Sequence, residues 1–178
     1  MQDTNTNTNG TVDETVNSNS FNRGVIEEFR AHGGRVKDFG SIPLLLLSTT
    51  GRVSGLTRTP PLVHLVRDGR HIVFAANGGA AVAPGWYRNL VAAGQGVVEV
   101  GRDRFAVRPE PVPEAEHEEL WRLQTAQDPN FATFRSKTDR TIPVVALVPI
   151  GDTADNGTTD TGTTDTGTTG ADTTGAAG

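Results

Sequence analysis

The dipeptide Asp68-Gly69 places the strongest constraint on the fold, because it separates two runs rich in apolar and β-branched residues, Thr57 to Arg67 and Arg70 to Ala76. A two-residue loop between strands prefers a type I′ turn, whose central residues both have positive φ, and Asp-Gly tolerates this conformation. The pattern therefore predicts a β-hairpin. Pro60-Pro61 in the first run removes two amide donors, so we expect strand pairing to begin near Leu62.

Other segments also read as antiparallel strands. A second hairpin is expected from Val97 to Gly101 and from Phe105 to Arg108, with its turn at Arg102-Asp103. Pro43 to Thr50 contains four consecutive leucines, which favours a strand buried on both faces, and Ile142 to Val148 predicts a last strand. Because a small sheet of hairpins avoids exposed edges best by curling, we expect a barrel of five or six strands.

Helices are expected between and around these strands. Three features mark them: cap residues, apolar residues at helical spacing, and a glycine or proline at an end. The expected segments are a helix after Asn17 to Ser20 that carries Val25, Ile26 and Phe29 and stops at Gly33-Gly34, a helix from Gly85 to Ala93, one from Pro113 to about Thr125, and a shorter turn from Phe131 to Phe134. The fold class is α+β, with a small, mostly antiparallel β-barrel and flanking helices.

Both ends of the chain differ from its middle. Residues 1–20 and 150–178 consist almost entirely of small and polar residues, which predicts disordered tails around one domain at residues 21–149. All 16 Lys and Arg lie in the middle, whereas eight of the 21 acidic residues lie in the tails, so the middle carries 16 minus 13, or +3, although the whole chain carries -5. A mildly basic, arginine-rich core suits a small anionic ligand, and its charge is too weak to indicate nucleic acid.

Several classes of chemistry are excluded by composition. The chain has no cysteine, which removes thiolate nucleophiles, disulfides and Cys-ligated metals. Its four histidines lack ligand spacing, so no metal site is expected, and neither a Ser-His-Asp order nor paired catalytic carboxylates are evident. No secretory signal is visible, and the longest apolar stretch is far shorter than the about 20 residues of a membrane span. We therefore expect a soluble, cytoplasmic protein, at most peripheral at the inner face of the plasma membrane.

Three segments could carry a ligand. In Thr49 to Arg58, two glycines let the backbone turn while Arg52, Ser54 and Arg58 offer donors to a phosphate; an ordinary basic turn is the alternative. Ala75 to Ala80 has almost no side-chain bulk, so a flat ring could lie against its backbone, or the segment could be a flexible connection. Pro84 to Leu90 offers Trp86 to the core, whereas Tyr87, Arg88 and Asn89 could face a cleft. Together they suit a cofactor whose own ring does the chemistry.

The order and spacing of these motifs resemble one known family, the deazaflavin-dependent nitroreductases, also called F420H2-dependent quinone reductases. The resemblance spans nearly the whole core, through Phe21-Asn22, Pro43 to Leu47, Thr50-Gly-Arg52, Ser54-Gly55 with Arg58, Pro61-Leu62, Asn77-Gly-Gly79, Trp86-Tyr87, and Thr138-Asp-Arg-Thr-Ile-Pro143. It implies a split β-barrel and coenzyme F420, a deazaflavin with an anionic phosphodiester and oligoglutamate tail.

The resemblance also implies roles for particular residues. The expected cofactor contacts are Arg52, Ser54, Gly55, Arg58, Pro61, Ala75, Ala76, Asn77, Gly78, Gly79, Trp86 and Tyr87. Tyr87 is the candidate catalytic residue, as proton donor or substrate contact, and the substrate side is expected at Val63, Phe131 and Phe134. The chain departs from the family where Val53 replaces a common Lys, where Asn77 replaces a Lys of some members, and where Phe131 and Phe134 replace tyrosines.

The expected function is an F420H2-dependent oxidoreductase that transfers a hydride to a quinone, an activated alkene or a nitroaromatic acceptor. Two alternatives stay open at this point: a split-barrel protein that binds FMN or haem, and a noncatalytic F420 carrier. The small-molecule acceptor is the expected partner, and the chain could be a monomer or a homodimer.

Overall fold

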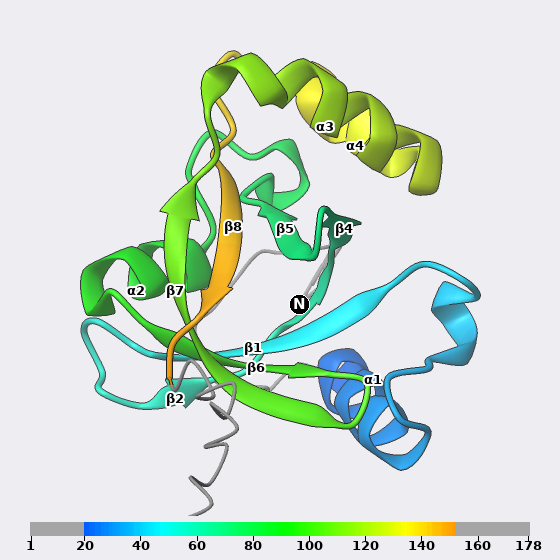
Figure 1. Cartoon of the computed structure of the whole chain (residues 1–178), viewed down its shortest axis with the longest axis vertical. Helices are drawn as coiled ribbons and strands as arrows, with labels where there is room; N and C mark the ends of the chain where they lie inside the picture. The colour runs from blue at the N-terminus through cyan, green and yellow to red at the C-terminus, as the bar shows by residue number, and fades with distance from the viewer. Residues whose placement is uncertain (1–19, 152–178) are drawn as a thin grey trace, which may run out of the picture.

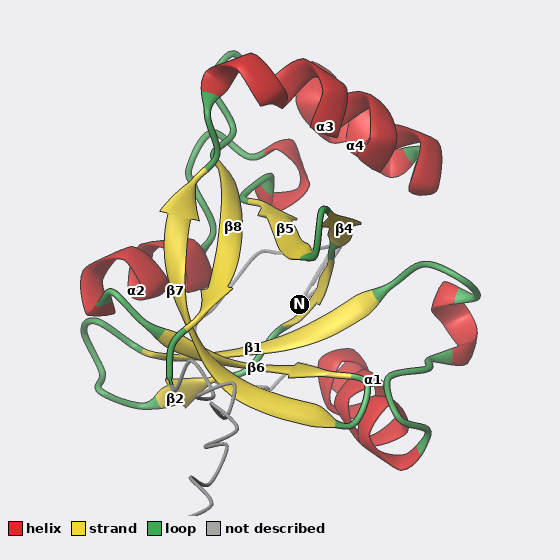
Figure 2. Cartoon of the chain, viewed as in Figure 1, coloured by secondary structure: helices red, strands yellow, loops and turns green. Residues whose placement is uncertain are grey.

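A computed structural model of the chain describes residues 20–151, so the predicted tails lie almost entirely outside the described residues. Within that range, eight strands form one sheet, flanked by four α-helices (Figures 1 and 2). The strands are β1 Leu44–Thr50, β2 Thr57–Arg58, β3 Pro61–Val63, β4 Leu65–Arg67, β5 Arg70–Phe74, β6 Gly96–Val100, β7 Asp103–Pro111 and β8 Val144–Pro149. The helices are α1 Ser20–Ala31, α2 Gly85–Ala93, α3 Glu114–Gln127 and α4 Asn130–Ser136, with 3-10 turns η1 Lys37–Phe39 and η2 Asn77–Gly79.

The sheet closes on itself at the bend between β3 and β4. The strand order is β2-β1-β6-β7-β8-β5-β4, and every pairing in it is antiparallel. β3 pairs back to β1, with Leu45 opposite Leu62, while β4 pairs with β5, with Leu65 opposite Ile72. One short run of chain thus joins the two sides of the sheet, and the expected α+β fold with a small antiparallel barrel is confirmed.

Both predicted hairpins form, and the first has the predicted turn. Asp68 and Gly69 have φ of 51° and 73°, and Arg67 lies opposite Arg70. The second turn lies one residue earlier than expected, because Val100 pairs with Asp103, which leaves Gly101 and Arg102 in the loop. Gly101 has φ of 60°, a conformation that glycine adopts without steric cost, so the glycine rather than Asp103 sets the position of this turn.

The two prolines delay strand pairing less than expected. Pairing already occurs at Thr57, which lies opposite Thr50, and Pro61 itself lies opposite Leu46. The prolines lack amide donors but keep their carbonyl acceptors, and Leu47 N donates to Pro60 O at 3.1 Å. The segment is therefore divided into β2, β3 and β4 rather than excluded from the sheet, which accounts for the larger number of strands.

Apolar side chains form three clusters on the two faces of the sheet. The barrel interior holds Leu45, Leu47, Val98 and Val107, to which α2 adds Trp86 and Leu90. The outer faces are covered separately: α3 and α4 pack Trp121, Phe131 and Phe134 against β4, β5 and β8, whereas α1 packs Val25, Ile26 and Phe29 against β1. Each helix thus buries the apolar face that the sequence predicted for it.

No helix within residues 20–151 is long and apolar enough to cross a membrane. The same residues contain no group of three or more histidine or acidic side chains that could hold a metal ion.

A pair of histidines lies at the bend between β3 and β4. His64 is 2% exposed, and its ring centroid lies 5.1 Å from that of His71 on β5. The Nδ1 atoms of both rings are buried and accept or donate no hydrogen bond in the described part of the chain. Burial, with a smaller contribution from His71, lowers the pKa of His64 to about 4, and burial also lowers the pKa of His71.

We expect the barrel to lose stability as the pH falls from 6.5 towards 4. Between these values the unfolded chain binds a proton at residue 64 that the folded chain does not, so the free energy of unfolding decreases by about 3 kcal/mol over this window and is unaffected above it. Urea unfolding at several pH values measures this dependence.

His64→Leu should make that dependence shallower, because leucine does not titrate, while the buried His71 ring continues to contribute to it. His32→Leu, which changes an exposed histidine near the end of α1, is the matched control and should leave the dependence as it is. A wild-type curve that is flat between pH 4 and 6.5 would contradict the prediction.

Candidate functional site

A cleft lies between the barrel and α4, and most of its lining residues were predicted from the sequence. Eight of its eleven lining residues belong to the predicted site: Pro61, Val63, Ala76, Asn77, Gly78, Trp86, Phe131 and Phe134. The other three, Leu62, Val73 and Phe74, were not predicted. The structure thus brings together expected cofactor contacts from β3, η2 and α2 with the residues expected on the substrate side.

One wall of this cleft is formed by residues 76–78 of the segment Ala75–Ala80, which we name the ledge; the predicted contacts Ala75 and Gly79 do not line the cleft. The three central residues of the ledge all have positive φ: Asn77 52°, Gly78 62° and Gly79 84°. Asn77 Nδ2 donates to Val82 O at 2.8 Å, which fixes the orientation of its side-chain amide. Asn77 also lines the cleft, and its Oδ1 is buried without a hydrogen-bond partner among the described residues.

The ledge is in close contact with α4, which carries both phenylalanines. A Cβ added at Gly79 would lie 2.6 Å from Phe134 O and 2.7 Å from Lys137 Cβ, so only glycine fits there. Phe131 and Phe134 pack edge to face at 5.3 Å, and Phe131 also contacts Phe74. The backbone contact at Gly79 therefore sets how far the phenylalanines stand from the ledge.

The loop between β1 and β2, residues 51–56, forms a second part of the predicted site, and we name it the arginine loop. Two backbone hydrogen bonds shape it, from Gly51 N to Leu56 O and from Gly55 N to Gly51 O, both 2.8 Å long. Ser54 Oγ accepts from Leu56 N at 3.3 Å and from Arg58 Nη2 at 3.4 Å. The Arg52 guanidinium is exposed and forms no ion pair with any residue that the structure describes. This loop can offer Arg52, Ser54 and Arg58 to an anion.

Helix α2 connects this loop to the cleft. Arg52 N donates to Asn89 Oδ1 at 3.1 Å, and Asn89 is buried on the helix that also carries Trp86 (Figure 1). The sequence suggested that Asn89 could face a cleft, whereas it holds the backbone of the loop. Tyr87 is half-buried, packs against the barrel interior and Trp86, and does not line the cleft.

Arg140 is a site residue to which the sequence assigned no role. Its guanidinium donates to three backbone carbonyls of the ledge, from Nε to Ala80 O at 2.8 Å and from Nη2 to Ala75 O and Ala76 O at 2.9 Å each. Burial lowers the pKa of this guanidinium. The motif Thr138 to Pro143 was part of the resemblance, which was the one sequence signal for this segment.

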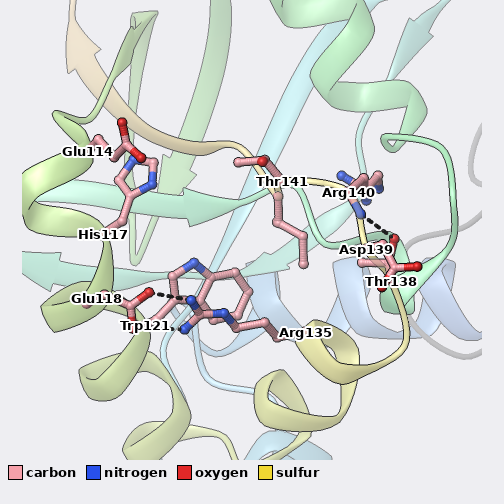
Figure 3. Close-up of a pocket in the computed structure, with 10 residues that line it drawn as sticks. Glu114, His117, Glu118, Trp121, Arg135, Thr138, Asp139, Arg140 and Thr141 are labelled. Atoms are coloured by element: carbon pink, nitrogen blue, oxygen red, sulfur yellow. Dashed lines mark hydrogen bonds and ion pairs between the residues drawn. The ribbon is translucent and has the colours of Figure 1, made fainter.

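A larger cavity of about 440 Å³ lies between α3, α4 and residues 138–142, and none of its lining residues was predicted. Figure 3 shows His117 and Glu118 of α3 on one side of it and Thr138, Asp139 and Arg140 on the other. Glu118 pairs with Arg135, whose guanidinium lies 5.3 Å from the Trp121 ring centroid. Glu118 and Arg135 thus neutralise each other, whereas Glu114 and Asp139, which also line the cavity, form no ion pair with a residue that the structure describes.

Comparison with known proteins shows the family of this chain. The model of the F420H(2)-dependent quinone reductase family matches residues 21–149. An F420H(2)-dependent quinone reductase of Mycobacterium tuberculosis is 36% identical over 125 residues, covering 67% of this chain and 83% of that protein. The chain therefore belongs to the F420H(2)-dependent quinone reductase family, whose members are oxidoreductases, and membership implies coenzyme F420 as the cofactor.

Solved structures show the same fold. An F420-H2 dependent reductase named FDR-A has a TM-score of 0.53 and 32% identity, covering 59% of this chain and 93% of that one. A protein described as a domain-swapped dimer has a TM-score of 0.54 and 28% identity, covering 72% and 97%.

The residues present fit the cofactor that this family uses. At the cleft the ledge offers a backbone with little side-chain bulk, which suits a flat heterocycle, and the buried Asn77 Oδ1 is an acceptor without a partner among the described residues. The loop at residues 51–56 offers Arg52, whose guanidinium forms no ion pair with a described residue, and the Ser54 hydroxyl, which suit an anionic tail.

We expect Gly79→Ala to destabilise the protein through its clash with α4. Gly79 and Gly69 have similar φ, 84° and 73°, but a Cβ at Gly69 has nothing within 4 Å. Gly69→Ala should therefore lower the free energy of unfolding by about 1–2 kcal/mol, through backbone strain alone. Gly79→Ala should lower it by about 1–3 kcal/mol more, because of the clash. Chemical denaturation of both variants measures the difference, and equal losses would show that α4 moves away from the ledge without cost.

Proposed function

We propose that this chain binds reduced F420 in the cleft beside the ledge and reduces a quinone, an activated alkene or a nitroaromatic compound held against Phe131 and Phe134. When bound, the cofactor supplies a hydride from its ring carbon to the acceptor. The observation that carries the proposal is the convergence in one cleft of the ledge, Trp86 and the two phenylalanines, with the arginine loop joined to the same helix.

The proposed role of the loop at residues 51–56 is to hold the phosphodiester and the acidic tail. Arg52 and Arg58 supply guanidinium donors, Ser54 supplies a hydroxyl, and Gly55, with φ of 70°, allows the turn that exposes them. Charge-assisted hydrogen bonds of this kind are about twice as strong as neutral ones. The middle of the chain carries a charge of 16 minus 13, or +3, which favours the approach of such an anion.

The proposed role of the ledge is to hold the ring. Ala76 and Gly78 line the cleft with little side-chain bulk, so a planar ring can approach their backbone within van der Waals distance, while Ala75 is buried in the barrel cluster and Gly79 lies against α4. We assign a ring N–H as the donor to Asn77 Oδ1, which is buried in the absence of the cofactor and has no hydrogen-bond partner among the described residues. Pro61 and Trp86 close the same cleft from β3 and α2.

The acceptor side of the cleft is apolar. Val63, Phe131 and Phe134 line it, and they present no hydroxyl group to a substrate. Flat conjugated acceptors such as quinones can lie against the phenylalanine rings. We assign the proton of the product to water rather than to Tyr87, because the Tyr87 side chain does not line the cleft. Positioning of the two reactants is then the main contribution of the chain.

A binding and turnover experiment tests this function. Purified full-length protein is titrated with F420 while the cofactor's fluorescence is followed, and oxidation of F420H2 is then measured with menadione as acceptor. We expect binding at micromolar concentrations and turnover above the uncatalysed rate.

The outcomes separate the alternatives. Binding without turnover would indicate a carrier, and yellow colour or a Soret band in the purified protein would indicate FMN or haem. Absence of F420 binding at micromolar concentrations would reject the proposal.

We expect Arg58→Ala to weaken F420 binding about 10-fold to 100-fold, because the loss of one charge-assisted hydrogen bond costs about 1.5–3 kcal/mol. The measurement is the dissociation constant from fluorescence titration at two salt concentrations, since a lost ionic contact also reduces the salt dependence.

Two further variants test whether the change in affinity depends on charge in this loop. Arg67→Ala removes an exposed arginine from β4, on the other side of the barrel, and should leave affinity unchanged. Val53→Lys adds a cation to the loop at a side chain that is 86% exposed, so it should tighten binding without a cost in packing. An Arg58→Ala affinity equal to that of Arg67→Ala would remove Arg58 from the site.

A further inference from the structure

The ledge has little of its own to hold it in place. Ala75 and Ala76 pack their methyl groups into the core clusters, but Gly78 and Gly79 have no side chain through which the turn could be anchored by packing or polar contacts. Its internal hydrogen bonds are backbone contacts at 3.0 Å, from Gly79 N to Ala76 O and from Ala80 N to Asn77 O. Gly78 and Gly79 also tolerate many backbone conformations, so they do not by themselves hold the segment in the observed conformation, in which three successive residues have positive φ. A defined ring-binding surface therefore requires an anchor from elsewhere in the chain.

The Arg140 side chain reaches both ends of the ledge. Its Nη2 donates to Ala75 O and Ala76 O before the three residues with positive φ, and its Nε donates to Ala80 O after them. One rigid, planar group thus joins the two ends of the strained segment. No carboxylate within residues 20–151 pairs with Arg140, so these carbonyls are its principal partners.

We propose that Arg140 is a positioning residue that fixes the shape of the ledge, and through it the placement of the cofactor ring relative to the acceptor. The part of this inference that concerns the cofactor ring rests on the proposed function, whereas the part that concerns the shape of the ledge does not. The contacts of Arg140 with the ledge exist in the protein without any ligand.

The surroundings of Arg140 show how the effect would reach the acceptor side. Pro143 O accepts a hydrogen bond from Ala75 N at 2.9 Å, so the segment that carries Arg140 runs beside the start of the ledge. Gly79, inside the segment that Arg140 spans, lies against the backbone of Phe134. A ledge released from Arg140 would therefore change its distance from both phenylalanines of the cleft.

A guanidinium suits this role better than an ammonium group. Arginine presents donors in a fixed planar fork that can reach carbonyls on two sides at once, whereas lysine offers one compact charge on a flexible chain. Arg140→Lys should therefore keep the charge and lose the simultaneous contact with Ala75 O and Ala80 O. This makes the lysine variant a test of geometry rather than of charge.

The first experiment uses the protein without cofactor. Hydrogen exchange is measured at the amides of the ledge in the wild type, Arg140→Lys and Arg140→Ala. Because hydrogen bonds to a charged group are worth about 1.5–3 kcal/mol, we expect exchange at Gly79 and Ala80 to become at least about tenfold faster in both variants, with the barrel strands unchanged. Arg135→Ala, which removes a guanidinium from the other side of the same cavity, is the matched control and should leave the ledge amides unchanged.

The second experiment measures function with F420. We expect Arg140→Ala to weaken F420 binding and to lower kcat at saturating cofactor, while the KM for menadione changes less. Guanidinium at low millimolar concentrations should restore both ledge protection and turnover to Arg140→Ala, whereas methylammonium should not. A purely structural role would not give this selective rescue.

Each outcome decides the inference. Faster exchange confined to the ledge, together with guanidinium rescue, supports it. Unchanged ledge exchange, or an increase of equal size across the barrel strands, overturns it. If the wild type fails to bind F420, the proposed function fails, and the exchange experiment alone still decides whether Arg140 holds the ledge.

Discussion

Burial of β1 on both faces is the constraint on which the remaining structure depends. Leu45 and Leu47 point into the barrel interior, whereas Leu44 and Leu46 lie under α1. Burial of each leucine is worth about 1.5–3 kcal/mol, so neither face of this strand can be given up without a large loss. β1 also pairs with β2, β3 and β6, and this places the arginine loop at the end of the strand and the β3 wall of the cleft beside its first three residues.

The two halves of the site are supported by different parts of the fold. α2 ties the arginine loop to the cleft, because Asn89 holds the backbone of the loop and Trp86 lines the cleft. The segment after α4 supports the other half, since Arg140 holds the ledge. The barrel provides a stable base between them, and the site itself is assembled from loops and helix ends that the barrel brings together.

Local patterns in the sequence were sufficient to predict much of this arrangement. The positive φ required at Asp68-Gly69, and the apolar spacing around Trp86 and Leu90, depend only on neighbouring residues. The turn at Gly101 was predicted one residue late because both Arg-Asp and Gly-Arg can occupy a hairpin loop. Arg140 lies 60 to 65 residues from the carbonyls it binds. Such a contact with backbone atoms leaves no pattern in the residue types of its partner, so only the structure shows it.

The close approach of Gly79 to the backbone of Phe134 affects how proteins with this fold can come to use different electron acceptors. The contact involves main-chain atoms on the α4 side, so side chains at positions 131 and 134 can vary while the separation between ledge and helix stays the same. New acceptors can then be accommodated by exchanging aromatic or polar groups on α4 without redesigning the cofactor half. Shifting the helix itself would instead require compensating changes in the ledge, which makes side-chain exchange the easier route for evolution and for engineering.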